Sequence, residues 1–297
     1  MTVKEYVDRG MEMLLSLYPR GEAKALLEIV LEGFCNYPAY TCYTDPDRFL
    51  PLEQLDELLG ALNDLHRGRP IQYIFGKTLF ESCIINVREG ALIPRPETAE
   101  LVRWARSVLE QQLRTNPSEE VNNTPLSVLD VCTGSGAIAV ALAKSFPQSK
   151  VYGVDISEEA LALAKENALL NNTEVQFWQA DILHPCSQSL ALDLMISNPP
   201  YVLTSEKETM RQNVLDYEPH IALFVPDDDP LLFYRALADW GMTLLKEGAL
   251  LMAEINEKMG EEVTRLLRHK GYSAIEINKD VNGKPRMCRA VKRHTTT

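Results

Sequence analysis

The stretch Asn198-Pro199-Pro200-Tyr201 combines the residue types in this sequence that are best suited to chemistry. It directly follows a short apolar run at residues 193–197, which predicts a buried strand. Proline has no N–H group, so the turn offers carbonyl oxygens and one side-chain amide but few backbone donors. Tyr201 adds a flat ring that could stack on a planar group. The pattern predicts an acceptor-rich pocket, with a purely structural Pro-Pro turn as the open alternative.

A second candidate site, at residues 130–136, lies between the apolar run at 127–131 and the helical stretch at 137–145. Small residues at such a turn let a ligand approach the backbone and the N-terminus of the helix, so a nucleotide-like ligand is expected. The spacing also fits the G-x-G-x-x-A pattern with Ala139 as its last member, which leaves a nicotinamide cofactor open. The candidate residues are Asp130, Cys132, Thr133, Gly134, Ser135 and Gly136.

Two further acids follow the next apolar runs. Asp155 ends the run at 151–155, where its carboxylate could accept hydrogen bonds from both hydroxyls of a ribose. Asp181, followed by Ile182, ends the run at 174–179 and is placed to meet an adenine amino group. Each acid alone could be a helix cap or loop residue, an interpretation that we favour for Asp181 taken singly. Together they predict one ligand lying across successive strand ends.

The elements that must position these residues alternate between strand and helix patterns from residue 126 onward. This alternation predicts an α/β fold with a seven-stranded, largely parallel sheet covered by helices on both faces. The last two strands are joined by a short loop containing Asn282-Gly283, so the final strand is expected to run antiparallel. The predicted strands are 127–131, 150–154, 174–179, 193–197, 249–254, 272–277 and 287–291, and the predicted helices are 137–145, 157–171, 230–246 and 258–270.

The N-terminal part has a different pattern. Apolar residues at helical spacing predict helices at 3–17, 22–34 and 52–67, and hence a small helical bundle. The leucine face of the third helix is more simply the bundle's own core than a groove for a partner. Strand-like runs at 71–75 and 82–87 predict a β-hairpin, and a helix at about 98–113 is followed by a polar loop at 115–125. We therefore expect a helical domain at 1–70, a β-hairpin linker at 71–93 and a main domain at 94–297.

Composition narrows the partners and the compartment. The 297 residues carry a formal charge of −12, and residues 1–90 alone hold 9 Lys and Arg against 14 Asp and Glu. A protein that binds duplex nucleic acid neutralises phosphates with Lys and Arg, so no nucleic-acid partner is expected. The six cysteines show no C-x-x-C pair and no zinc-ligand spacing, which predicts no metal and a reducing compartment. With no signal peptide and no apolar run long enough for a membrane helix, we expect a cytoplasmic protein without membrane partners.

In their order along the chain, these motifs resemble those of the class I S-adenosylmethionine-dependent methyltransferases that modify planar nitrogen. The segment 93–98 (IPRPET), the segment 217–220 (YEPH) and the helical N-terminus narrow the resemblance. The whole chain resembles the protein-(glutamine-N5) methyltransferases of peptide chain release factors, the HemK/PrmC family. It departs from that family at Cys132, where glycine is common, and at Ile182, where some members present an aromatic ring near adenine.

The resemblance implies a Rossmann-like methyltransferase sheet, S-adenosyl-L-methionine as the cofactor and the glutamine of a Gly-Gly-Gln motif in release factors as the substrate in translation termination. Residues 1–70 would recognise that protein substrate, and the enzyme is expected to be a monomer. Asn198 and the Pro199 carbonyl would hold the glutamine amide, with Tyr201 stacked on it. Open alternatives are a methyltransferase for a nucleobase amino group, a glutamine methyltransferase for a ribosomal protein, and a non-catalytic cofactor-binding adaptor. The implied catalytic and substrate-binding residues are Asn198, Pro199, Pro200 and Tyr201, and the implied cofactor-binding residues are Asp130, Cys132, Thr133, Gly134, Ser135, Gly136, Asp155, Asp181, Ile182 and Asn198.

Overall fold

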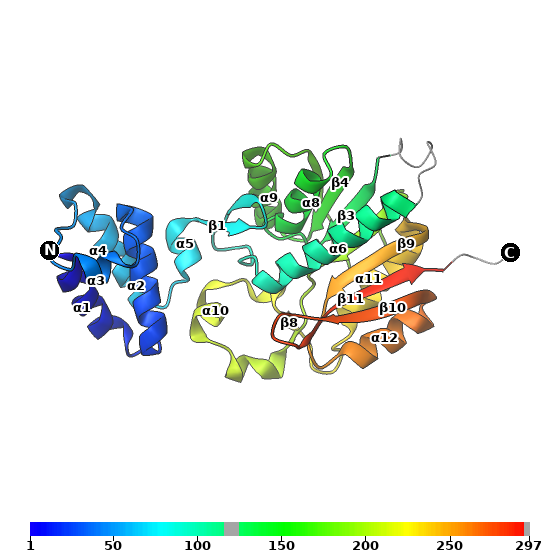
Figure 1. Ribbon diagram of the computed structural model, residues 1–297. Helices are drawn as coiled ribbons and strands as arrows, with labels where there is room; N and C mark the ends of the chain where they lie inside the picture. Colours follow the sequence, from blue (N-terminus) through cyan, green and yellow to red (C-terminus); the bar gives the residue numbers. More distant parts are fainter. Residues whose placement is uncertain (116–124, 294–297) are drawn as a thin grey trace. The chain divides into compact units, whose positions relative to one another are not determined.

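The computed structural model describes residues 1–115 and 125–293, which divide into two compact units. The helical unit comprises Met1–Gly76 together with a later segment, Arg211–Tyr217. The larger unit begins at Lys77 and contains the rest of the chain, including the sheet labelled in Figure 1. The segment Arg211–Tyr217 falls within the main domain expected from the sequence, but it groups with the helical unit.

The helical unit is built around one apolar core. Thr2 begins the first helix with a capping box, in which its side chain accepts a hydrogen bond from the N–H of Glu5 and the Glu5 carboxylate accepts one from Thr2. Leu58, Leu62 and Leu65 of the predicted leucine face are buried, so that face is largely the unit's own core. The elements are α1 (Val3–Leu14), α2 (Arg20–Cys35), α3 (Thr41–Thr44), η1 (Leu52–Gln54), α4 (Leu55–His66), α5 (Ile71–Phe75) and α10 (Gln212–Tyr217).

The strand predicted at residues 71–75 is wrong, because the structure has the single-turn helix α5 there. Pro70 precedes the helix with φ −55°, and Gly76 ends it in the left-handed region with φ 67°. Ile71 and Ile74, three residues apart, both pack against the core of the helical unit. Helical spacing of these two contacts outweighs the strand propensity of the β-branched residues.

The hairpin that was predicted does exist, but it is formed by β1 (Lys77–Phe80) and β2 (Cys83–Asn86). Asn167 in helix α9 (Glu158–Leu170) and Asn171, the C-terminal cap of that helix, bind the second strand of the hairpin. Asn167 accepts a hydrogen bond from the N–H of Asn86 at 2.7 Å, and Asn171 accepts one from the N–H of Ile84 at 3.1 Å. The hairpin is thereby fixed to the side of the larger unit that carries α9.

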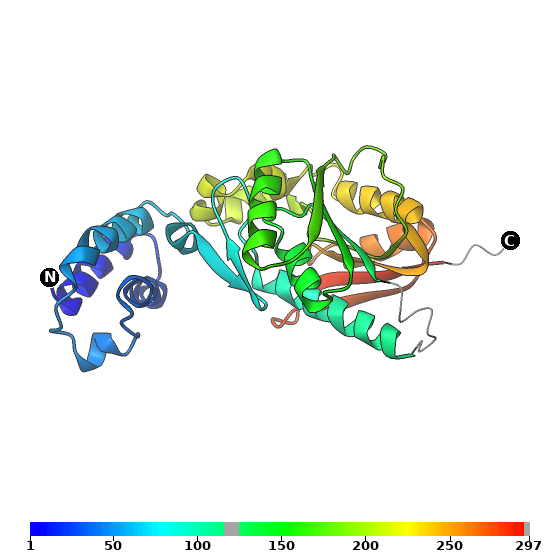
Figure 2. The same ribbon diagram turned by 90° about the horizontal axis from the view of Figure 1, so that it is seen from above.

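The sheet of the larger unit has seven strands in the order β10-β11-β9-β6-β3-β4-β5. Figures 1 and 2 show this unit from two directions. All neighbouring pairs are parallel except those made by β11, which is antiparallel to both β9 and β10. The predicted sheet and its antiparallel final strand are therefore confirmed. The strands are β3 (Ser127–Val131), β4 (Lys150–Asp155), β5 (Val175–Gln179), β6 (Leu192–Ser197), β9 (Leu245–Glu254), β10 (Tyr272–Lys279) and β11 (Pro285–Lys292).

Helices cover the sheet in two groups. The chain moves from β3 towards β5 through α8 and α9 and in the opposite direction from β6 to β9 through α11, so right-handed crossovers place these helices on opposite faces. Helix α6 contacts α8, and α12 contacts α11. Their bounds are α6 (Pro96–Thr115), α8 (Ala137–Ser145), α11 (Leu232–Leu244) and α12 (Gly260–His269). A two-stranded sheet, β7 (Val202–Leu203) with β8 (Phe224–Val225), and the 3-10 helices η2 (Thr204–Thr209) and η3 (His220–Ala222) complete the unit.

Candidate active site

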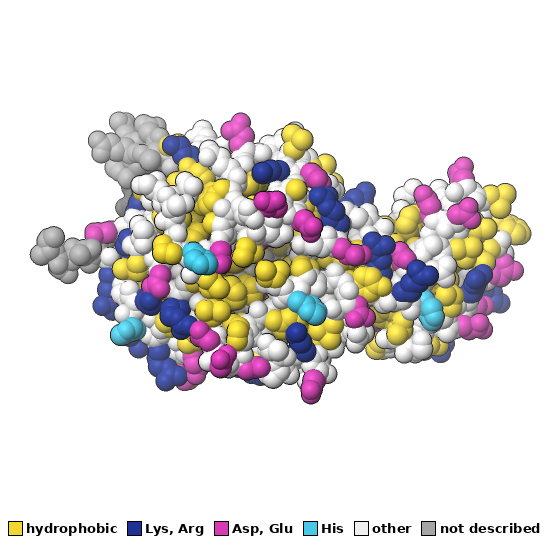
Figure 3. All heavy atoms as spheres, turned by 180° about the vertical axis from the view of Figure 1, so that it is seen from behind, with side chains coloured by type: hydrophobic (Ala, Val, Ile, Leu, Met, Phe, Trp, Pro, Cys, Tyr) yellow, Lys and Arg dark blue, Asp and Glu magenta, His cyan; other side chains and the backbone are white. Residues whose placement is uncertain are grey.

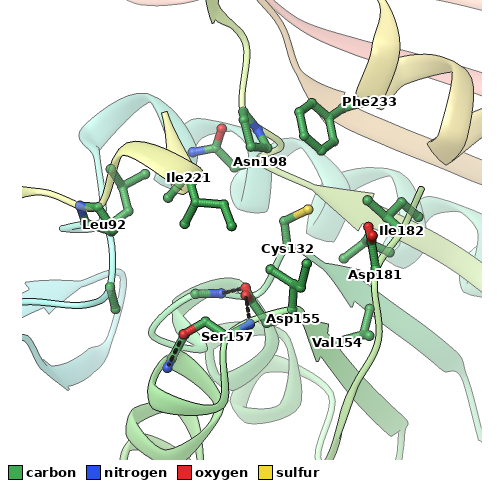
Figure 4. A pocket seen from close by; sticks show the side chains of 18 of the residues that line it. Leu92, Cys132, Val154, Asp155, Ser157, Asp181, Ile182, Asn198, Ile221 and Phe233 are labelled. Atoms are coloured by element: carbon green, nitrogen blue, oxygen red, sulfur yellow. Dashed lines mark hydrogen bonds between the residues drawn. The ribbon is translucent and has the colours of Figure 1, made fainter. Parts of the chain in front are cut away.

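A cavity of about 180 Å³ lies at the carboxyl ends of β3, β4, β5 and β6. This is where open parallel sheets bind ligands, at the point where the strand order reverses. Figure 4 shows Asn198 across the cavity from Asp155 and Ser157. Of the residues predicted from sequence, those that line the cavity are Cys132, Gly134, Asp155, Asp181, Ile182, Asn198 and Pro200. Asp130, Thr133, Ser135, Gly136, Pro199 and Tyr201 are not in the cavity wall.

Asp130 lies buried behind the cavity at the end of β3 and holds the glycine-rich loop in shape. Its Oδ2 accepts hydrogen bonds from Thr133 Oγ1 at 2.6 Å and from the Ala139 N–H at 3.1 Å. Its Oδ1 is buried without any hydrogen-bond partner. Burial raises the pKa of this carboxyl to about 7, against the lowering effect of those two hydrogen bonds. An uncompensated acceptor at the base of a ligand pocket is expected where a ligand carries a donor or a positive charge.

The glycine-rich loop follows a path that favours small residues. Gly136 begins α8 with φ 79°, and a Cβ at this position would lie 3.1 Å from the backbone Cα of Ala164 in α9. Gly134 has φ 55° and lines the cavity, and a Cβ there would meet nothing within 4 Å. Cys132 also has a positive φ, 57°, the region in which glycine is the least strained residue. The departure from glycine noted in the sequence therefore falls at a backbone conformation that glycine fits best.

Asp155 ends β4 and links the loop to the next helix. Its Oδ2 accepts the Gly134 N–H at 2.8 Å, and its Oδ1 accepts the Ser157 N–H at 3.0 Å, as the dashed lines in Figure 4 show. Burial raises its pKa, while the backbone donors oppose the rise. Ser157 in turn caps α9 by accepting the Ala160 N–H. The carboxylate has more acceptor positions than these backbone donors occupy, so Asp155 can still accept from hydroxyl groups in the cavity.

Asp181 and Ile182 form another wall of the cavity, beyond the end of β5. Asp181 Oδ1 accepts the Leu183 N–H at 2.9 Å, and Oδ2 is 2.9 Å from Nδ1 of His184. The loop role considered for Asp181 from sequence is thus present, and the residue also faces the cavity. Ile182 is buried and contributes an apolar surface.

Asn198 follows β6 and is held through its side-chain nitrogen. Nδ2 donates to Thr98 Oγ1 at 3.0 Å, and Thr98 Oγ1 lies 2.7 Å from Oε2 of the buried Glu254. Tyr201 does not face the cavity, because its hydroxyl donates to the other Glu254 oxygen at 2.6 Å and its ring packs against the apolar core. Stacking of Tyr201 on a substrate amide stays a prediction. Thr98 and Glu254 were not found as site residues from sequence.

Other cavity residues lie in or directly beside the two segments that narrowed the family resemblance, 93–98 and 217–220. Leu92 and Pro219 line the cavity, next to the buried Glu218. Glu218 Oε1 accepts from the Arg95 guanidinium at 2.6 Å, and Oε2 accepts the Ile93 N–H at 3.3 Å. One carboxylate therefore joins segments 93–98 and 217–220, which are distant in sequence. Also missed were the cavity residues Gly90, Ala91, Ile221 and Phe233, which lack a chemical signature in the sequence.

Comparison with known proteins identifies the family. The sequence pattern described as "Methyltransferase small domain" matches residues 107–217. A protein of Flavobacterium psychrophilum named release factor glutamine methyltransferase is 37% identical over 287 residues, covering 97% of this chain and 98% of the relative. A relative of the same name from Bacteroides thetaiotaomicron is 39% identical and covers 94% of this chain and 96% of its own. This chain belongs to the release factor glutamine methyltransferase family.

Solved structures support the fold of this methyltransferase. The catalytic domain of human Mettl16, solved in complex with MAT2A 3′UTR hairpin 6, matches with a TM-score of 0.55 over 79% of this chain and 84% of its own. The human methyltransferase 10 domain containing protein matches with a TM-score of 0.50, over 71% of this chain and 89% of its own. Their sequence identities, 13% for the first and 15% for the second, restrict the comparison to the fold.

Among the described residues, no helix of this family member is long and apolar enough to cross a membrane.

The cofactor of this family member is S-adenosylmethionine, and the cavity fits it. The buried Oδ1 of Asp130 lacks a donor, the open space at Gly134 leaves room against the backbone, and Asp155 retains free lone pairs beside the loop. The apolar walls at Val154 and Ile182 suit a flat ring. Gly134, Val154, Asp155 and Ile182 would hold the group, with Asp155 suited to the ribose hydroxyls, while Asp130 behind the wall would support the loop.

Proposed function

We propose that this protein transfers a methyl group from S-adenosylmethionine to the side-chain amide nitrogen of the glutamine in the Gly-Gly-Gln motif of peptide chain release factors. The observation that carries the proposal is Asn198 at the wall of the cofactor cavity, with its nitrogen engaged by Thr98. No hydrogen bond within the described chain involves Asn198 Oδ1, which leaves that oxygen for an amide donor. The family relatives carry this activity in their names.

The reaction needs help with a weak nucleophile, because the lone pair of an amide nitrogen is conjugated with its carbonyl. S-adenosylmethionine supplies an electrophilic methyl group on a positively charged sulfur. Asn198 Oδ1 and the Pro199 carbonyl would each accept one N–H of the glutamine, which holds its nitrogen in a fixed orientation. Positive charge develops on that nitrogen, and fixed acceptor oxygens stabilise it. The methylated amide then loses one proton to solvent, so no strong general base is required.

The competing functions are less well supported. Lys and Arg are interspersed with Asp and Glu on the face shown in Figure 3, and the chain carries a net charge of −12, which is unfavourable for binding a nucleic acid. Only the names of the relatives, which specify release factors, favour a release factor over a ribosomal protein as the glutamine substrate. We place the reaction in the cytoplasm, in keeping with six free thiols, and expect a monomer on size-exclusion chromatography.

The decisive experiment combines a substrate assay with one substitution. Wild-type protein incubated with radiolabelled S-adenosylmethionine and a purified release factor should place the label on the Gly-Gly-Gln glutamine, located by mass spectrometry. Asn198→Ala should lower kcat by about 100-fold or more, the scale for removing one well-placed polar group. Affinity for S-adenosylmethionine should change much less. Normal turnover by folded Asn198→Ala protein would exclude the acceptor role, and labelling of a ribosomal protein instead would exclude the substrate.

We also propose that residues 1–70 recognise the protein substrate. Phe49 and Leu52 of this segment are 74% and 86% exposed, and apolar side chains of this kind anchor protein contacts. Phe49→Ser with Leu52→Ser should raise KM for a release factor about tenfold and leave S-adenosylmethionine affinity unchanged. Leu79→Ser, at a side chain that is also 74% exposed but lies in the hairpin, is the matched control. An unchanged KM in the double variant would remove the recognition role from this surface.

A further inference from the structure

A chain of buried hydrogen bonds leads away from the amide acceptor into the protein. Asn198 Nδ2 is 3.0 Å from Thr98 Oγ1, and Thr98 Oγ1 is 2.7 Å from Glu254 Oε2. Thr98 lies in the first turn of α6, and Glu254 is the last residue of β9. Both side chains are buried, with relative exposures of 4% and 1%. The chain therefore joins three elements that are far apart in sequence.

The number of protons available in this chain of hydrogen bonds determines which group donates in each bond. A carboxylate can only accept, so the single proton of the Thr98 hydroxyl is donated to Glu254. The Thr98 oxygen is then left as an acceptor, and only the amide nitrogen of Asn198 can satisfy it. If the Asn198 amide were rotated by 180°, two acceptor oxygens would face each other. The arrangement therefore fixes which end of the amide is left for a ligand.

Two further groups, Tyr201 and Arg286, favour the ionised, acceptor form of Glu254. Tyr201 donates its hydroxyl proton to Glu254 Oε1 at 2.6 Å, so the carboxylate receives two hydroxyl donors. Burial raises the pKa of Glu254 above its usual range, and these two donors and the nearby Arg286 guanidinium oppose that rise without reversing it. A buried carboxylate with both oxygens occupied is a rigid reference point for the groups that bind it.

We propose that Thr98 and Glu254 are positioning residues that fix the side-chain amide of Asn198 with its oxygen towards the substrate nitrogen. This inference rests on the proposed function for its kinetic consequence but not for the orientation itself. A reversed amide would present N–H groups to the N–H groups of the glutamine, which is repulsive. The network thus presents the neutral amide oxygen of Asn198 as the acceptor and places no charge at the reacting nitrogen.

The kinetic test removes only the Thr98 hydroxyl. Thr98→Val keeps the shape of the side chain and should lower kcat about 5- to 13-fold, the equivalent of the ~1 to 1.5 kcal/mol of one net hydrogen bond. Thr98→Ser restores the hydroxyl and should return kcat to within about threefold of wild type. Thr264→Val, which makes the same change at a helix hydroxyl bonded only to the Gly260 carbonyl, is the matched control and should keep wild-type kcat. The dissociation constants for S-adenosylmethionine, and for a release factor in the presence of S-adenosylhomocysteine, should stay within about threefold.

A double-mutant cycle separates positioning from general damage. In an Asn198→Ala background, Thr98→Val should change kcat less than about twofold, because the amide that it positions is gone. Multiplicative losses in the double variant, or wild-type kcat in Thr98→Val, would overturn the proposal.

A measurement without turnover tests the orientation directly. The side-chain amide protons of Asn198, assigned by their loss in the ¹⁵N–¹H spectrum of Asn198→Ala, should exchange with solvent at least about tenfold faster in Thr98→Val than in wild type. Equal exchange rates would overturn the positioning role. If wild-type protein fails to methylate any release factor but this difference is present, the proposed substrate is wrong and the network stands.

Discussion

The buried carboxyl of Asp130 makes the stability of the ligand-free enzyme depend on pH in a direction opposite to that of most acids. The substitution Asp130→Asn keeps the shape and can preserve both hydrogen bonds to Oδ2, from Thr133 and Ala139, at its single amide oxygen. It replaces the unpartnered Oδ1 by a neutral NH₂ group. The variant therefore removes one buried charge with little change in packing.

The magnitude follows from the pKa of Asp130, which burial raises from 3.8 to about 7. The folded protein then binds more protons than the unfolded chain between these two values, so the free energy of unfolding falls as pH rises through this window. Each pKa unit corresponds to ~1.36 kcal/mol, so the full contribution by pH 8 is on the order of 4 kcal/mol. Between pH 5 and pH 8, the stability advantage of Asp130→Asn should widen by about 2 to 3 kcal/mol. An unpartnered amide NH₂ lowers that advantage by ~1 kcal/mol at every pH.

The assay is urea unfolding of both proteins, followed by circular dichroism at pH 5, 6, 7 and 8 without S-adenosylmethionine. Taking the difference between the two proteins cancels the titration of most other groups. Calorimetry should also show weaker cofactor binding by the variant, because a negative charge buried behind the cavity wall is lost. A stability difference that does not change with pH would refute the argument that the buried Asp130 carboxylate destabilises the ligand-free protein.

Three further predictions follow from the loop and its neighbours. Asp155→Ala should weaken S-adenosylmethionine binding by about 1.5 to 3 kcal/mol in calorimetry, and unchanged affinity would reduce Asp155 to a residue that only binds Gly134 and Ser157. Gly136→Ala should destabilise the enzyme by about 2 kcal/mol or more in urea unfolding, because φ is 79° and the new Cβ meets the Ala164 backbone at 3.1 Å, and a wild-type midpoint would contradict this. The Cys132 thiol, whose pKa is raised by burial and by the nearby Asp155 and Asp130 carboxylates, should react slowly with iodoacetamide at pH 8 although it lines the cavity; rapid labelling in mass spectrometry would refute this.

The sequence predicted the sheet well because its strands are short apolar or alternating runs bounded by polar turns. Even the direction of β11 was predictable, since the loop at residues 282 and 283 is too short for a parallel crossover. Residues 71–75 were predicted wrongly because their local pattern favours a strand, whereas the contacts of Ile71 and Ile74 with the helical core decide the structure. Local patterns therefore predict elements until a distant packing surface imposes a different spacing.

Site residues at the ends of strands were predictable from the sequence. Site residues that depend on contacts between distant parts of the chain were not. Cys132, Asp155, Asp181 and Asn198 follow four different strands, and the parallel sheet brings them to one cavity. The bond between Thr98 and Glu254 joins residues 156 positions apart, and no local pattern marks Glu254 as different from a residue at the end of a buried strand. For the same reason, the sequence indicated Tyr201 as a stacking ring and did not reveal the carboxylate that binds its hydroxyl.

The position of β11 has a consequence for how the protein folds as it is synthesised. β10 has only one neighbour in the sheet, and that neighbour is β11, which lies between β10 and β9 but comes last in the chain. Until the ribosome has released residues up to Lys292, β10 cannot join the sheet, and β9 presents an unpaired edge. The neighbouring Glu254, which ends β9, gains its final surroundings only at that stage. Completion of the sheet therefore waits for the synthesis of β11, and a nascent chain stalled before β11 is expected to expose an aggregation-prone edge beside an unfinished active site.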